Sequence, residues 1–462
     1  MEIWVNIFLV LSLSQMKTRE VIDDTAAQQC INKVLEHCCL RRFLLTDEAA
    51  RAMMDVGWDF VPEVSELQSA FESGGVEECT SMLERKRDEW KNIPVNVAVT
   101  GSSGVGKSSF IDAIRRLTAD DDGAAAVGVK ETTFGISCFP HPNNPLLKFW
   151  DLPGVGTDRS PRQKYLSAID VDWYDFFLLI TADRFTDNDT WLGNEFRKRN
   201  MKYFFVRTKI GVDISNNKKS HPRTHDERAV VEDIRASTRQ HLRENGCEDV
   251  PVFLIDNYKL DKFEFDQLEQ HLVDEFPKLK KTALLLSLQA TSKEMIGLKV
   301  AELRSRMWKL AALSGAVAMA PVPGVIVVFD LALVVKEADF YYTQLGLDET
   351  SLKRYAKLTS TDYRQLQSIV NRCLGCRAIG VAGMKTMVEE LYKSAPSLVT
   401  STAIEESSKL IPLIGSFIAG SLSFGGTYLT LKLVLDKMES VALEVMQFAA
   451  ESAAVADQSD ED

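Results

Sequence analysis

The run "GSSGVGKSS" at residues 101–109 constrains the fold of this chain more than any other feature. It follows the β-rich stretch "VNVAVT" and precedes "FIDAIRRL", whose composition is helical. A glycine-rich loop that ends in Gly-Lys-Ser between a strand and a helix is the pattern of a P-loop, whose main-chain N–H groups surround a phosphate. The alternative, a chance turn rich in glycine and serine, does not account for these flanks. The sequence therefore predicts a nucleotide-binding α/β domain.

Each residue type in this loop suits contact with a polyphosphate. Its glycines let the backbone curl so that N–H groups point at the β-phosphate. Lys107 brings a positive charge to the β- and γ-phosphates, and Ser108 brings a hydroxyl to Mg²⁺. We therefore predict that the nucleotide contacts Gly101, Ser102, Ser103, Gly104, Val105, Gly106, Lys107, Ser108 and Ser109.

A second motif, "DLPG" at residues 151–154, ends an apolar run and matches the Asp-x-x-Gly element of GTP-hydrolysing proteins. We predict that Asp151 holds Mg²⁺ through a water molecule and that the N–H of Gly154 contacts the γ-phosphate. A hydroxyl between the two motifs should close over Mg²⁺, and the candidates are Thr132 and Thr133. Each is also an ordinary β-former at the start of a strand. We assign Thr133 to the metal and, with Lys107 and Gly154, to catalysis.

The residue after this motif is Val155. Ras-like GTPases place a glutamine there, and its side chain orients the attacking water. Because a valine side chain cannot form a hydrogen bond to water, we expect slow unaided hydrolysis. The missing group must come from elsewhere in the chain or from a partner.

The stretch "TKIGVD" at residues 208–213 departs from the pattern of a guanine reader, Thr-Lys-x-Asp, because Gly211 replaces the acid. Losing the charged bidentate bond to guanine costs about 1.5–3 kcal/mol, or about 10- to 100-fold in affinity. Lys209 can still lie along the base, with Thr208 beside it. We predict weakened guanine selection with intact phosphate contacts, and tighter guanine binding after Gly211→Asp. If that change has no effect, Asp213 already serves as the reader.

The sequence pattern that predicts secondary structure changes twice along the chain. Strand-like runs alternate with helix-like runs in the middle of the chain, at 95–100, 134–139, 146–151, 174–181, 202–208 and 250–256. This alternation predicts a doubly wound, mostly parallel sheet of the α/β class. Both flanking parts are rich in helix formers. The predicted parts are an N-terminal helical segment at 1–92, a P-loop G domain at 93–278, an all-α domain at 279–447 and an acidic tail at 448–462.

Composition excludes some classes of function. A net charge of −12 argues against nucleic acid as a partner, because binding to phosphates demands a basic surface. The eight cysteines are scattered, as in a cytoplasmic protein with reduced thiols. Cys373 and Cys376 have the spacing of metal ligands, but no second pair completes a zinc site.

Three apolar runs bear on membranes. The first, Trp4–Leu13, is too short to span a bilayer, and the second, 310–329, is broken by Pro321 and Pro323. The third, 411–431, is 21 residues without a charge and long enough in principle. Its glycines suit close helix packing, which favours a buried helical hairpin over a transmembrane helix, with peripheral membrane contact between the two.

From about residue 60 to about 447 the chain resembles the immunity-related GTPases, the interferon-inducible IRG proteins. The resemblance rests on "GSSGVGKSS", "GAAAVGVKETT", "HPNNPLLKFWDLPGVGT", "YFFVRTK", "PVPG", "GLDETSL" and "IPLIGSFIAGSLSFGGTY", in this order. It implies a Ras-like G domain on a helical domain formed by both chain ends, with GTP or GDP and Mg²⁺ bound. It also implies nucleotide-dependent self-association, cytoplasmic localisation with peripheral attachment to internal membranes, and a role in resistance to intracellular pathogens.

The resemblance assigns further residues. Glu131 falls on an acid that would contact the nucleotide across a G-domain dimer and take part in catalysis. Asn257 falls on the last base-contacting loop, and Asp213 on a second acid that family members often carry after the base reader. Glu2 stands where some members have a myristoylated glycine, so that anchor cannot form. With Gly211 and Val155 in view, the alternative function is a pseudo-GTPase that serves as a membrane-associated scaffold.

Overall fold

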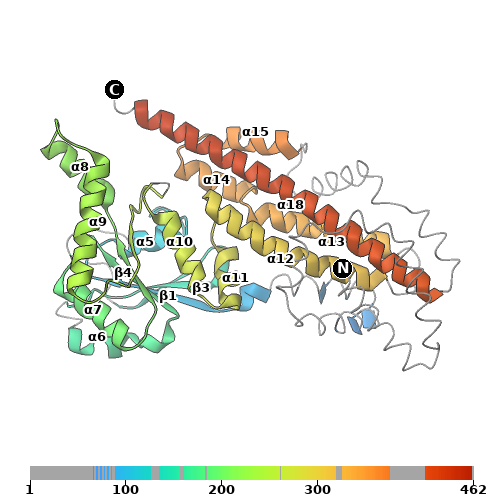
Figure 1. The fold of residues 1–462 in the computed structure, drawn as a ribbon, viewed down its shortest axis with the longest axis horizontal. Coiled ribbons are helices and arrows are strands. Elements are labelled where there is room, and N and C mark those ends of the chain that lie inside the picture. Colours follow the sequence, from blue (N-terminus) through green and yellow to red (C-terminus); the bar gives the residue numbers. More distant parts are fainter. Residues whose placement is uncertain are drawn as a thin grey trace. The chain divides into compact units, whose positions relative to one another are not determined.

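The computed structural model is drawn in Figure 1. The chain divides into two compact units. The larger unit is Thr80–Leu303 with Val334–Ser394 and Lys432–Asp462, and the smaller is Met1–Cys79 with Arg304–Leu333 and Ala395–Leu431. The domain boundaries predicted above stay predictions. The structure describes residues 89–125, 135–156, 161–182, 185–260, 262–318, 325–374 and 412–459, together with single positions between Glu66 and Arg85.

The larger unit contains a six-stranded sheet in the order β2-β3-β1-β4-β5-β6. All neighbouring strands run parallel except β2, which is antiparallel to β3. The predicted α/β class and mostly parallel sheet are thereby confirmed. The strands are β1 (Val95–Gly101), β2 (Ser137–His141), β3 (Asn144–Asp151), β4 (Phe176–Thr181), β5 (Tyr203–Arg207) and β6 (Val252–Leu254).

Helices cover both faces of this sheet. Successive side chains of a strand point to opposite faces, so a strand can contribute residues to two cores. Val97 and Val99 of β1 pack in one core with α5, α10 and α11. Ala98, between them, packs in a second core with α6, α7 and α9. β4, "FFLLIT", is buried on both faces, as expected for a central parallel strand. The covering helices are α5 (Lys107–Ile114), α10 (Phe265–Asp274), α11 (Lys278–Ser287), α6 (Arg162–Ile169), α7 (Asp187–Lys198) and α9 (Glu227–Glu244).

Two strands differ in extent from the predicted runs. The run 134–139 was expected to be extended, and the strand found there is β2, which reaches His141 and turns directly into β3. So short a connection can join only antiparallel neighbours, which explains the reversed edge strand. The last predicted run, 250–256, contributes only the three residues of β6, which begins after Pro251, a residue without an N–H to donate.

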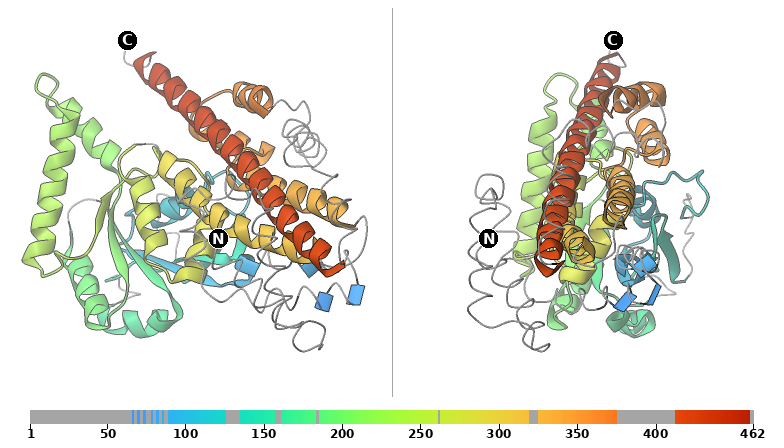
Figure 2. Two further views of the ribbon diagram at one scale, coloured as in Figure 1. Left: turned by 45° about the vertical axis from the view of Figure 1, so that its right-hand side comes forward. Right: turned by 90° about the vertical axis from the view of Figure 1, so that its right-hand side faces the viewer.

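The remaining helices lie outside the two layers on the sheet. α8 contacts α9, to which a short loop joins it (Figure 2), and α14 packs on α15. α12, α13 and α18 each contribute residues to both units. These elements are α8 (Ile210–Ser220), α12 (Lys293–Ala318), α13 (Val325–Gln344), α14 (Glu349–Leu358), α15 (Tyr363–Leu374) and α18 (Pro412–Ser459), with short 3₁₀ turns η3 (Glu89–Asn92) and η4 (Val171–Trp173).

The apolar runs meet different outcomes. Of the run 310–329, residues 310–318 belong to α12 and residues 325–329 to α13, and residues 319–324, with both prolines, lie outside the described part. Residues 412–431 of the third run fall in α18, which continues as one helix to Ser459 and is not a hairpin, and residue 411 lies outside the described part. Among the described residues, no helix has both the length and the apolar character needed to cross a bilayer.

A buried ion pair fixes the end of α5. Arg116 Nη2 lies 2.9 Å from Glu269 Oε2 of α10, and the two side chains are 2% and 1% exposed. The same guanidinium group donates to Thr291 Oγ1 at 2.7 Å, just before α12. One arginine therefore connects the P-loop helix to two later segments of the chain.

Candidate nucleotide-binding site

The backbone of the loop between β1 and α5 has a shape that requires glycine at three positions. Gly101, Gly104 and Gly106 have φ values of 140°, 78° and 94°. A Cβ at Gly101 would lie 2.1 Å from the carbonyl oxygen of Ile180 on the neighbouring strand. The loop is therefore a tightly curled strand-to-helix connection of the kind that a P-loop needs.

Lys107 is held within this loop. Its Nζ donates to the carbonyl oxygens of Ser102 and Gly101 at 3.0 and 3.4 Å, and the residue is only 7% exposed. The ammonium group is therefore positioned by the loop that would surround the phosphates. A charge placed in advance costs little reorganisation when a ligand arrives.

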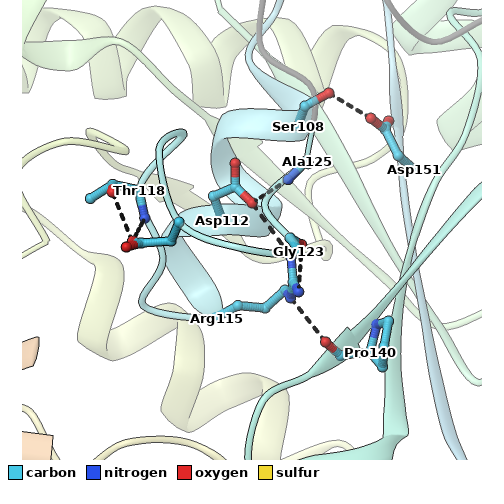
Figure 3. A network of polar contacts seen from close by, with 9 residues as sticks. Ser108, Asp112, Arg115, Thr118, Gly123, Ala125, Pro140 and Asp151 are labelled. Carbon is cyan, nitrogen blue, oxygen red and sulfur yellow. Dashed lines mark hydrogen bonds and ion pairs between the residues drawn. The ribbon is translucent and has the colours of Figure 1, made fainter. Parts of the chain in front are cut away.

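The two predicted magnesium ligands meet. Ser108 Oγ donates to Asp151 Oδ2 at 2.6 Å (Figure 3). β1 and β3 run parallel with Val99 opposite Asp151, so strand register brings the acid to the P-loop. A hydroxyl and a carboxylate are hard oxygen donors, and Mg²⁺ is usually bound by one or two such groups, with waters and phosphate oxygens completing its shell. The residues therefore fit a nucleotide-bound Mg²⁺.

The "DLPG" segment lies against the P-loop. A Cβ at Gly154 would be 3.0 Å from the backbone N of Ser103, so the two loops approach as closely as glycine allows. Tyr165 of α6 holds this segment, because its hydroxyl donates to the carbonyl of Pro153 at 3.0 Å and lies 2.6 Å from Thr100 Oγ1. Gly154 is therefore placed near the end of the loop where a γ-phosphate would lie.

Val155 faces the protein interior. Its side chain is 2% exposed and belongs to the core beneath α6 and α7. Its carbonyl accepts a hydrogen bond from Asn188 Nδ2 of α7 at 3.2 Å. This side chain is an apolar packing residue and has no means of orienting a water molecule.

The chain segments on either side of Glu131, Thr132 and Thr133 are tied to α5, while these three residues lie outside the described part of the chain. Asp112 Oδ1 accepts from the N–H of Ala125 at 2.7 Å (Figure 3). Burial raises the pKa of Asp112, and the bond from Ala125 lowers it.

On the return side, Arg115 Nε donates to the carbonyl of Pro140 in β2 at 3.1 Å. The same guanidinium group donates to the carbonyl of Gly123 at 2.9 Å. Asp112 and Arg115 therefore fix both ends of the segment that carries the predicted switch residues.

Two other loops meet the P-loop at the carboxyl edge of the sheet. After β5, Thr208 Oγ1 donates to Val105 O at 2.7 Å and Lys209 Nζ donates to Gly104 O at 2.9 Å. After β6, Asn257 Nδ2 donates to Gly106 O at 3.1 Å. Ligands of open α/β sheets bind at this edge. The three predicted base-side residues are therefore brought together there.

Two acids near Gly211 have different partners. Asp213 Oδ2 lies 2.6 Å from Arg207 Nη2 in an ion pair, and its contact with nucleotide stays a prediction. Asp256 accepts from the N–H of Gly211 through Oδ2 at 3.1 Å and from the N–H of Tyr258 through Oδ1 at 2.9 Å. Sequence reasoning did not single out Asp256, although its position two residues after a strand at this edge was a usable signal.

Tyr258 is a second residue that sequence reasoning missed. It is 82% exposed, and its hydroxyl lies 3.5 Å from Ser109 Oγ at the start of α5. An aromatic ring that is exposed beside a base-binding edge can stack on a base, which is worth about 1–3 kcal/mol.

We expect Tyr258→Ala to weaken GDP binding by about 5- to 100-fold through the lost stacking. The affinity is measured by isothermal titration of GDP in the presence of Mg²⁺. Tyr258→Phe, which keeps the ring and loses the hydroxyl, is the matched control and should bind like the wild type. Unchanged affinity in Tyr258→Ala would mean that the ring does not contact the base.

Comparison with known proteins agrees with this geometry. A family model described as interferon-inducible GTPase (IIGP) matches residues 61–395. The Rattus norvegicus protein "Interferon-inducible GTPase 5" is 33% identical over 383 residues, which cover 83% of this chain and 81% of the rat protein. The Bos taurus protein of the same name is 34% identical with the same coverage. The Mus musculus "Interferon-inducible GTPase 1" is 33% identical over 304 residues, covering 66% of this chain and 74% of the mouse protein.

Proposed function

This chain belongs to the interferon-inducible GTPase family, and from that premise we propose that it binds GTP with Mg²⁺ and hydrolyses GTP slowly to GDP and phosphate. The observation that supports this best is the 2.6 Å hydrogen bond from Ser108 Oγ to Asp151 Oδ2. It brings together a hydroxyl and a carboxylate that suit Mg²⁺, next to a lysine that the loop already holds.

Different groups of the chain bind different parts of the nucleotide. Backbone N–H groups of residues 101–109 surround the β-phosphate, and Lys107 neutralises charge on the β- and γ-phosphates. Ser108 and Asp151 would hold Mg²⁺, which when bound neutralises the charge that develops on the phosphate oxygens. The N–H of Gly154, beside Ser103, contacts the γ-phosphate and senses its loss.

The buried side chain of Val155 cannot orient the attacking water, so activation requires another group. We propose that a second copy of the chain supplies it through a G-domain dimer, in which Glu131 contacts the nucleotide across the interface. Family membership supports this self-association. Family membership also supports two further parts of the proposal, which are cytoplasmic localisation with peripheral attachment to internal membranes and a role in cell-autonomous immunity.

The test is the hydrolysis rate per molecule as a function of protein concentration. We expect it to rise with concentration, because activation depends on dimers, and we expect Glu131→Ala to flatten this rise while leaving GTP affinity unchanged. Glu131→Asp, which keeps the charge, is the matched control. A rate that is measurable but independent of concentration would place the activating group within one chain. Absence of hydrolysis at every concentration, with GTP still bound, would favour the pseudo-GTPase scaffold.

A further inference from the structure

We propose that Asp256 carries the carboxylate that recognises the guanine base, in the role that an acid at position 211 would otherwise have. This inference rests on the proposed function, because it assumes that a guanine nucleotide binds at the P-loop. It assigns base selection to the loop after β6 and explains why position 211 is glycine.

The first observation is the overlap in space between Asp256 and a side chain at position 211. A Cβ built on Gly211 would lie 2.4 Å from Asp256 Oδ2, closer than any non-bonded contact allows. This separation is also that between Cβ and a carboxylate oxygen within one aspartate. If residue 211 were an aspartate, its own carboxylate oxygens would also lie about 2.4 Å from its Cβ. Oδ2 of Asp256 is therefore at the same distance from this Cβ position as those oxygens would be. Any larger residue at 211 would have to displace Asp256.

The second observation is strand order. β5 and β6 are neighbouring parallel strands, and the N–H of Ile210 donates to Ile255 O at 3.3 Å just beyond their carboxyl ends. Residue 211, in the first turn of α8, and residue 256, after β6, therefore face each other although they are far apart in sequence. A carboxylate can reach this place from either loop.

The third observation concerns hydrogen-bonding capacity. Among the described residues, the Asp256 carboxylate accepts one backbone N–H on each oxygen, from Gly211 and Tyr258. An ionised carboxylate has about four acceptor positions, so each oxygen can accept a second bond. Guanine presents two adjacent donors, N1–H and the 2-amino group, and adenine presents an acceptor at the matching edge. A carboxylate with one open position on each oxygen selects guanine.

The surroundings support this assignment. Asn257, next to Asp256, donates to the P-loop carbonyl of Gly106, and Lys209 donates to that of Gly104. Asp256 is therefore fixed beside the loop that would hold the phosphates, and it is 6% exposed. Asp213, two residues beyond Gly211, forms an ion pair with Arg207 at 2.6 Å.

A purely structural role for Asp256 makes a different prediction. Gly211 is in the first turn of α8, and a carboxylate that accepts its N–H caps that helix. If capping were the whole role, loss of the carboxylate would lower the melting temperature but would not change which base is bound. Base selectivity is therefore the readout that separates the two roles.

The experiment measures dissociation constants of the full-length protein for GDP, xanthosine diphosphate (XDP) and ADP with Mg²⁺. In Asp256→Asn, an amide N–H₂ replaces an acceptor, which opposes the 2-amino group of guanine and matches the 2-oxo group of xanthine. We expect GDP binding to weaken by about 10- to 100-fold and the preference to shift toward XDP. Asp226→Asn, the matched control, alters a carboxylate that caps α9, and it should leave the GDP-to-XDP ratio unchanged.

Two variants test directly whether the carboxylate at position 256 replaces one at position 211. Gly211→Asp alone forces two carboxylates into contact, so we expect weaker GDP binding, the opposite of the effect expected from the sequence. Gly211→Asp combined with Asp256→Ser returns the carboxylate to position 211 and should recover GDP binding. Melting temperatures of all variants show which of them fold.

The outcomes separate this inference from the proposed function. A wild type that prefers GDP, with the same GDP-to-XDP ratio in Asp256→Asn, would overturn the role of Asp256 and leave the GTPase intact. Equal binding of GDP and ADP by the wild type would also overturn it while leaving nucleotide binding in place. Failure of the wild type to bind any of the three nucleotides would overturn the proposed function itself, and this inference with it.

Discussion

Lys107→Ala is expected to lower kcat for GTP hydrolysis by about 10²- to 10³-fold, the loss that follows removal of one oriented donor to a developing negative charge. The ammonium group is already fixed on the carbonyls of Ser102 and Gly101, at 3.0 and 3.4 Å, so its contribution is preorganised. We also expect GTP affinity to fall by about 10- to 100-fold, because a charged hydrogen bond is lost. Single-turnover hydrolysis at saturating GTP measures the first effect, and titration measures the second.

Lys209→Ala is the matched control, because Lys209 also donates to a P-loop carbonyl, that of Gly104, at 2.9 Å. Lys209 comes from the base side of the site, so its loss should raise the dissociation constant of GTP with little change in the rate of the bound complex. Wild-type kcat in Lys107→Ala would contradict the GTPase mechanism. Equal losses of kcat in both variants would show a general loosening of the loop.

The phosphate side of the site could be predicted because its information is local. Lys107 and Ser108 follow β1 within one strand–loop–helix unit, and Asp151 ends the strand that pairs with β1. In a parallel sheet the carboxyl ends of neighbouring strands meet at one edge, so placement of these residues follows from the pattern. The doubly wound fold could be predicted because the alternation of strands and helices is also a local sequence pattern.

The partners of the acids on the base side could not be predicted, because they depend on side-chain contacts between residues that are distant in sequence. Gly211 reads as a missing carboxylate until the neighbouring loop shows Asp256 at hydrogen-bonding distance from it. Asp213 reads as a possible substitute until Arg207 is found 2.6 Å away. Likewise, a missing glutamine can be read from Val155, but the burial of its side chain requires the packed core.

Arg116→Met is expected to lower the free energy of unfolding by about 3–5 kcal/mol, because it leaves a buried carboxylate without its charged partner. Arg116 lies 2.9 Å from Glu269, with both side chains almost fully buried. Among the described residues, Glu269 Oε1 has no hydrogen-bond partner, so the arginine is its main compensation. Urea unfolding followed by circular dichroism measures the change. Replacing both members, as Arg116→Met with Glu269→Leu, should recover most of the loss, since apolar residues of similar size can replace a buried pair.

The loss in Arg116→Met should also depend on pH. Burial raises the pKa of Glu269 from 4.5 to about 7, against the opposing effect of Arg116. A raised carboxyl pKa means that the native state favours the protonated form, so the stability from this group falls as pH rises from 4.5 through about 7. Above that range the carboxylate is charged and needs Arg116, whereas below it a neutral carboxyl needs the arginine less. The deficit of Arg116→Met should therefore be larger at pH 8 than at pH 6. The Arg116 guanidinium group also lies over the ring of Phe265. A deficit that is equal at the two pH values would show that the cost arises from packing around this ring and not from the charge. A double variant as unstable as the single one would show the same.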